Sequence, residues 1–124
     1  MSVRQTTILC SPAAGSSGSA TATAISSEII NGLIVGIHVD YLDSPPATTV
    51  VTIAEAYNSP AMPILTLTNK NTDDWFQPLA AAEDTAGAAI TNAGLVVGVM
   101  DRVKVTIAGA NAGDGVKVTI RWAM

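Results

Sequence analysis

Residues 103–122, VKVTIAGANAGDGVKVTIRW, decide the fold class of this sequence. Apolar and polar residues alternate on both sides of a stretch rich in glycine and alanine, and alternation of period two is typical of half-buried strands. The apolar residues of the two sides are Val103, Val105 and Ile107, then Val116, Val118, Ile120 and Trp122. We therefore predict a C-terminal β-hairpin, with its turn at 108–115, one apolar face and one polar face.

The same alternation extends back towards the N-terminus. No amphipathic helix of about ten residues interrupts it, so the crossover connections of a parallel sheet are missing. We predict an all-β fold of about seven to nine strands, an antiparallel β-sandwich that is jelly-roll-like. The strand-like segments before the hairpin are 3–9, 20–27, 33–42, 48–57 and 62–68.

Three local predictions follow from composition and alternation. Residues 80–94, rich in alanine and glycine, are expected to form mostly a long loop, with one short helical turn at 80–82. Trp75 and Phe76 precede a proline, which favours an edge strand or an extended segment, and we expect both rings to be buried. In the segment 33–42, the residues expected to face the core are Leu33, Val35, Ile37, Val39 and Tyr41.

The sequence SPAAGSSGS at 11–19 has the composition of a flexible linker. We divide the chain into residues 1–19, a flexible N-terminal strand or arm with its Gly/Ser linker, and residues 20–124, the β-sandwich domain. Two interpretations stay open: the arm binds a neighbouring subunit, or the linker is a hairpin loop within one sheet. On the first, the candidate partner-binding residues of the arm are Val3, Arg4, Ile8 and Leu9.

Composition excludes several functions for the 124-residue chain. Six basic residues against ten acidic ones give a net charge of -4, which argues against binding nucleic acid or an anionic membrane surface. No run of about 18 apolar residues is present, so we expect no membrane span. The start lacks the apolar segment of a secretory signal, and we expect the protein to be made and assembled in a reducing cytosol.

The sequence offers little for catalysis, and we expect no enzyme, no cofactor and no metal. His38 is the only histidine, and we place it at the surface or in an interface. Cys10 is the only cysteine, has no nearby base and is expected to be buried or half-buried. Asp73 and Asp74 are better explained by Asx-type turns than by calcium. Glu55 alone faces the core side of its strand, which a strand end, a bulge or a site explains equally well.

Four of the six basic residues point to the same side of the predicted hairpin. Two interpretations stay open for this side: an ordinary solvated sheet face, or a contact surface for an acidic protein partner. The four residues are Arg102, Lys104, Lys117 and Arg121.

A resemblance to a known family covers residues 27–122, about three quarters of the chain. The segments that carry it are GLIVGIHVDY at 32–41, DSPPATT at 43–49, TDDWFQP at 72–78, TAGAAI at 85–90 and AGDGVKVTI at 112–120. This pattern resembles small virion structural proteins of tailed bacteriophages, among which head decoration (cement) proteins are common. The segments are turn-and-strand patterns, so they bear on the family more than on the exact role.

The resemblance implies a β-sandwich that binds the outside of a capsid and bridges neighbouring subunits. The implied partners are the major capsid protein and further copies of this chain, as a homotrimer or homodimer, on a particle assembled in the host cytoplasm. Repeated weak contacts on a symmetric shell would supply the avidity. The alternatives are another virion component, such as a head–tail joining or tail protein, and a receptor- or carbohydrate-binding β-sandwich.

Overall fold

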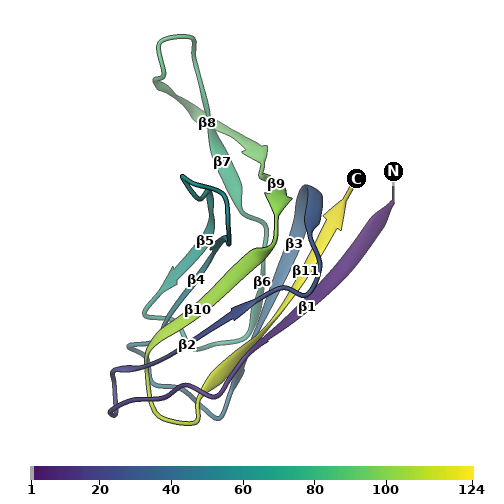
Figure 1. The fold of residues 1–124 in the computed structure, drawn as a ribbon. Coiled ribbons are helices and arrows are strands. Elements are labelled where there is room, and N and C mark those ends of the chain that lie inside the picture. Colours follow the sequence, from purple (N-terminus) through teal and green to yellow (C-terminus); the bar gives the residue numbers. More distant parts are fainter. Residues whose placement is uncertain (1) are drawn as a thin grey trace.

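The computed structural model describes residues 2–124, and every strand pair in it is antiparallel. The strands form two facing sheets and one hairpin that projects away from them (Figure 1). Their bounds are β1 (Val3–Cys10), β2 (Ala20–Ile25), β3 (Ile30–Leu42), β4 (Val50–Glu55), β5 (Pro63–Thr68), β6 (Asp74–Phe76), β7 (Leu79–Glu83), β8 (Ala89–Val96), β9 (Gly98–Asp101), β10 (Val103–Ala110) and β11 (Gly115–Ala123).

The strand order of the two sheets is that of a jelly roll. The first sheet runs β1-β11-β3-β6, with β9 also paired to β3, and the second runs β2-β10-β4-β5. Leaving aside the inserted strands β7, β8 and β9, every chain-consecutive pair except β4 and β5 lies in opposite sheets. This alternation is how a double-sheet jelly roll wraps its chain, and the predicted fold class is confirmed.

The core lies between the two sheets, where the alternating apolar residues of β10 and β11 are completely buried or nearly so. The predicted C-terminal hairpin is wrong, however, because β10 pairs with β2 and β4 while β11 pairs with β1 and β3. The connection between them crosses from one sheet to the other. Near the end of β10, where its register against β2 shifts, Gly109 adopts φ +64°, and a Cβ there would lie 2.4 Å from the Thr48 carbonyl oxygen.

A β-bulge changes which side of β3 faces the core. The register against β11 shifts between Gly36 and Ile34, so Val35 is an extra residue. After the bulge, Ile37, Val39 and Tyr41 are buried as predicted. Before it the alternation inverts: Ile34 is buried, while Leu33 and Val35, which we predicted to face the core, are exposed.

The N-terminal segment is an edge strand of the molecule's own first sheet rather than a free arm. Residues 3–10 pair with β11 without a break, and Ile8 and Cys10 are buried in the core. Residues 11–19 then cross between the sheets, so they are not a hairpin loop within one sheet. Ala13 exchanges backbone hydrogen bonds with the 113–114 turn, and Asn111 accepts hydrogen bonds from Ser17 and Gly18.

Residues 79–96 form the projecting hairpin β7–β8, where we predicted a loop with a helical turn. The Asp84 carboxylate accepts the backbone N–H groups of Ala86 and Ala88, and Gly87 adopts φ +81°. An aspartate with a glycine three residues later is a common turn sequence, and it marks this turn in the chain. The two strands were not predicted because the segment is rich in alanine and glycine, which are depleted in strands.

Candidate interaction surfaces

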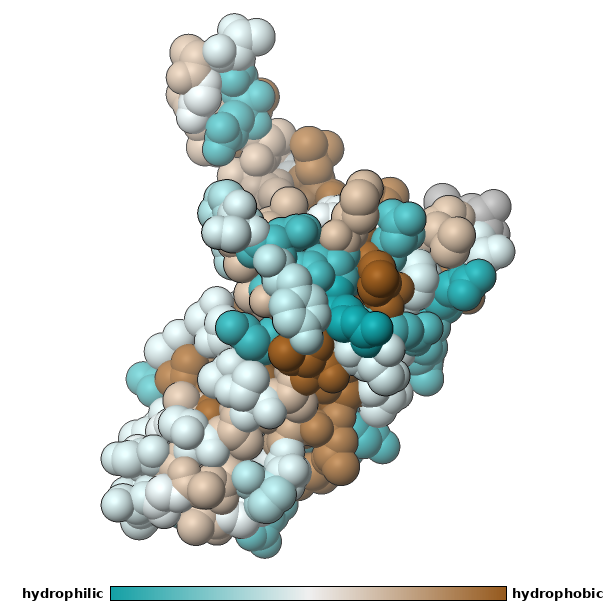
Figure 2. All heavy atoms as spheres, viewed as in Figure 1, coloured by the Kyte–Doolittle hydropathy of each residue, from teal (hydrophilic) through white to brown (hydrophobic). Residues whose placement is uncertain are grey.

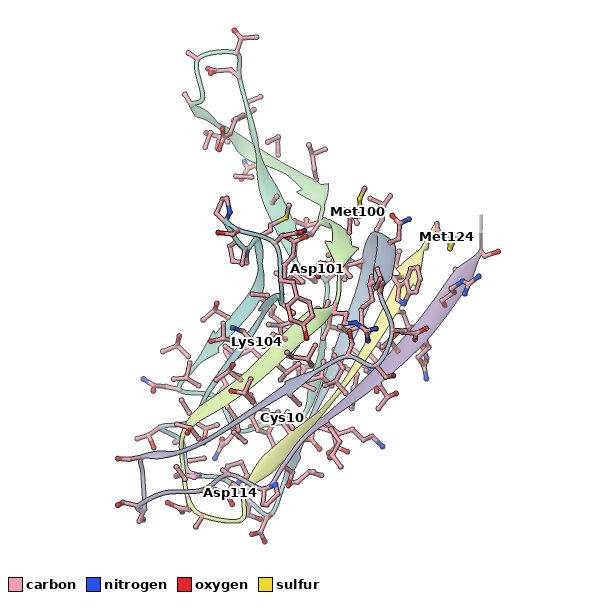
Figure 3. All side chains as sticks on the ribbon, viewed as in Figure 1. Cys10, Met100, Asp101, Lys104, Asp114 and Met124 are labelled. Atoms are coloured by element: carbon pink, nitrogen blue, oxygen red, sulfur yellow. The ribbon has the colours of Figure 1, made fainter. Side chains whose placement is uncertain are left out.

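The basic residues of the C-terminal strands do not share one surface. Because β10 and β11 belong to opposite sheets, Lys104 lies on the outer face of the second sheet (Figure 3), and Lys117 and Arg121 lie on the outer face of the first. The prediction that all four point the same way is therefore wrong. Their role in binding a partner stays a prediction, now for two separate faces.

Arg102 has a partner within the chain. Its guanidinium donates hydrogen bonds to the backbone carbonyls of Ser26 and Ser27, and the Ser26 hydroxyl in turn accepts the Val103 N–H. This arrangement fastens the β2–β3 connection to the start of β10. A side chain held in this way is less available to a binding partner than Lys104 or Lys117.

Trp75 lies on the outer face of the first sheet. Its indole is 47% exposed, so the expectation that it is buried is wrong, whereas Phe76 beside it is half-buried and packs against the core. The His38 ring lies 4.9 Å away, centroid to centroid. The Arg121 guanidinium stacks 4.5 Å from the indole centroid. A Cβ added at Gly36 of β3 would lie 3.6 Å from this ring, at ordinary van der Waals distance.

Glu55 and Asp101 are buried carboxylates, and both hold the loop that joins β4 and β5. Glu55 ends its strand and accepts hydrogen bonds from the Asn58 amide and the Met62 N–H. Asp101, labelled in Figure 3, accepts the N–H groups of Tyr57 and Asn58. Of the three explanations left open for Glu55, these contacts favour the strand end.

The pKa of Asp101 is lowered. Burial alone would raise this pKa, but backbone N–H groups from Asn58, Tyr57 and Arg102, with Ala56, outweigh it and favour the charged form. Because the N–H groups of the β4–β5 loop favour the ionised carboxylate, Asp101 is suited to holding that loop in place.

The remaining titratable residues of interest also have structural partners. Asp73 accepts the Tyr41 N–H of β3, and Asp74, the first residue of β6, accepts the Trp75 N–H. Neither carboxylate forms the predicted Asx-type turn. Cys10 is buried between the sheets (Figure 3), and burial raises the pKa of its thiol. Within residues 2–124, no three His, Cys, Asp or Glu side chains are grouped to hold a metal ion. No helix in that range could cross a membrane.

The four candidate residues of the N-terminal segment divide into two kinds. Val3 and Leu9 are 64% and 59% exposed, whereas Ile8 is only 4% exposed and belongs to the core. Arg4 places its guanidinium 5.7 Å from the centroid of the Trp122 ring. Val3 and Leu9 are therefore free to contact a partner, and Ile8 is not.

The hairpin β7–β8 exposes the largest group of apolar side chains away from the sandwich. Nearly all of its strand residues are exposed, and hydrophobic residues line the part nearest the body (Figure 2). Four large apolar side chains are exposed on it: Leu79, Ile90, Leu95 and Val96. An open cavity of about 410 Å³ lies at its base, bounded by Met62, Pro63, Ile64, Leu65, Thr66, Leu79, Ala80 and Val97.

Comparison with protein-family models, with curated proteins and with solved structures found no match to this chain.

Proposed function

We propose that this chain is a structural protein of a tailed-phage particle. It acts as a head decoration (cement) protein that binds the outer capsid surface and bridges neighbouring capsid subunits. The proposal takes its direction from the sequence resemblance. Binding only the assembled shell stabilises that shell by mass action.

The observation that carries the proposal is the projecting hairpin. A two-stranded hairpin is marginally stable in water on its own, and β7–β8 exposes apolar side chains that the rest of the chain does not cover. Such a projection gains most by packing against another protein. The capsid surface is the partner we propose for it, with Leu95 and Ile90 in the contact.

The test uses Leu95→Asp, with Thr91→Asp as the matched control on the same exposed strand. Both proteins are mixed with capsids of the encoding phage from which decoration has been removed, and bound protein is measured by co-sedimentation and cryo-EM. We expect Leu95→Asp to lower affinity by about tenfold or more, because a charge replaces a buried apolar contact. The control should bind like the wild type.

Two results would overturn this proposal separately. Wild-type protein that does not bind the capsids removes the decoration role itself. Equal binding of both variants removes the hairpin as the contact. Density for the protein at the head–tail junction or on the tail, rather than over the shell, assigns it to one of the other virion components.

A second candidate function, carbohydrate or receptor binding, is favoured by one observation. Trp75 is exposed on a sheet face beside His38 and Arg121, and an exposed indole with polar neighbours suits a sugar ring. Since the Arg121 guanidinium already stacks on that indole, a sugar would have to compete with it, and we rank this function second. Glycan titration of tryptophan fluorescence tests it: a saturable change that Trp75→Ala abolishes supports it, and no change rejects it.

A further inference from the structure

Among the edge strands of the two facing sheets, β1 is the longest and the least protected. Natural proteins protect edge strands with proline, short length, charge or a covering segment. The edge strand β5 begins with Pro63, β6 is three residues long, and β2 is partly covered by the Ala14–Thr21 bridge. In contrast, β1 has eight residues, no proline or glycine, and a single charge.

The backbone groups that β1 leaves free follow from its register. Ser2 and Met124 exchange two backbone hydrogen bonds, with N to O distances of 3.2 and 3.1 Å. Residues at intervals of two from such a pair bond in the same way, so Arg4, Thr6, Ile8 and Cys10 use their groups on β11. The N–H and C=O groups of the residues between them face outward. Those residues are Val3, Gln5, Thr7 and Leu9.

We propose that a second copy of this chain pairs with this edge, antiparallel, with Thr6 opposite Thr6 at a two-fold axis. In this register Val3 faces the other copy's Leu9, and Gln5 faces its Thr7. Every outward backbone group then has a hydrogen-bond partner, which a shift by two residues would not achieve. The two exposed apolar side chains of the strand cover each other on the outer face.

The self-complementarity of β1 is the reason for proposing a second copy of this chain as its partner. An isologous two-fold contact uses the same patch on both subunits. Of the outward-facing residues equidistant from Thr6, Val3 and Leu9 are both apolar and Gln5 and Thr7 are both polar. Arg4 is the only charge on the strand, and it faces Ile8 rather than a second arginine. The two first sheets join into one continuous sheet. This dimer would exist in solution without any capsid, so it does not depend on the proposed function.

Charge substitutions at positions 3 and 9 test the register in the full-length protein. In Val3→Lys/Leu9→Lys, like charges face each other across the two-fold axis and weaken dimerisation by about tenfold or more. In Val3→Glu/Leu9→Lys, opposite charges face each other and the dimer is retained, with an affinity that falls as salt rises. Dissociation constants come from sedimentation equilibrium over micromolar to millimolar concentrations.

Proline at position 7 tests the backbone pairing. Thr7→Pro removes an outward N–H that the chain itself does not use, so it should weaken the dimer by about tenfold or more while leaving the fold intact. Thr7→Val keeps the N–H and is the matched control. Circular dichroism checks folding, and if the proline variant unfolds, the two charge variants decide.

Each outcome of these experiments either supports the dimer or overturns it. A wild-type dimer that only Thr7→Pro and Val3→Lys/Leu9→Lys weaken supports the proposal. A wild-type monomer, a trimer, or a dimer that all variants leave unchanged overturns it. Capsid binding is not a readout here, so a failed decoration experiment leaves this result standing.

Discussion

Tyr41 has the only buried side-chain nitrogen or oxygen without a hydrogen-bond partner in the part of the chain that the structure describes. Burial, followed by the negative charge of Asp73, raises the pKa of its hydroxyl. A buried hydroxyl without a partner costs free energy, so Tyr41→Phe should increase the free energy of unfolding by about 1 kcal/mol. Urea unfolding measures it, with the exposed Tyr57→Phe as a neutral control. A less stable Tyr41→Phe protein would contradict this account.

Asp101 makes stability depend on pH. Its pKa in the folded state lies below the ordinary value of 3.8, so the ionised form stabilises the fold. This stabilisation is fully present above pH 3.8 and is lost as pH falls through the lower pKa of the folded state. Asp101→Asn should therefore be less stable than wild type at pH 7, and the difference should shrink towards pH 2. Chemical unfolding at stepped pH measures it; a difference independent of pH would reject it.

At the scale of elements, the two faces of β11 should respond very differently to charge. Val118 is completely buried, whereas its neighbour Thr119 lies on the outer face. A buried unpaired carboxylate costs several kcal/mol or more, comparable to the whole stability of a small domain. Val118→Asp should not fold and Thr119→Asp should. Val105→Asp and Lys104→Glu form the same pair on β10. Circular dichroism of soluble protein decides, and a folded Val118→Asp would refute the assignment.

The hairpin β7–β8 should be dispensable for folding because it buries little of itself. Replacing residues 80–95 with a short Gly/Ser loop leaves both sheets intact, so we expect the sandwich to retain its near-ultraviolet circular dichroism and to melt within a few degrees of the wild type. The same protein should lose capsid binding. A large fall in melting temperature would show that the hairpin is part of the core.

At the scale of the whole molecule, the alternation of apolar residues predicted the strands and the core faces of β10 and β11 well. Side-chain period two is a local property, so Val105 and Val118 could be assigned to the core from sequence alone. It also identified the outer-face position of His38. The burial of Cys10 was also predicted, whereas the contact of Asp73 with Tyr41 on β3 is long-range and was not.

What the sequence did not reveal depends on contacts between distant residues. Alternation says which side of a strand faces the core but not which strand lies beside it, so β10 and β11 were mistaken for a hairpin. The four basic residues were then grouped on one face. The bulge at Val35 depends on pairing with β11, and the exposure of Trp75 depends on β6 lying at the sheet edge. Sequence reasoning missed the hairpin surface because alanine-rich strands have low strand propensity.

The position of β11 has a consequence for synthesis of the protein. It lies between β1 and β3 in the first sheet, yet its residues, 115–123, are translated after those of both neighbours. The growing chain therefore contains β1 and β3 before it contains the strand that pairs with both. That sheet closes only after residues 115–123 have been made, and products that stop short of residue 115 leave β1 and β3 with unpaired edges.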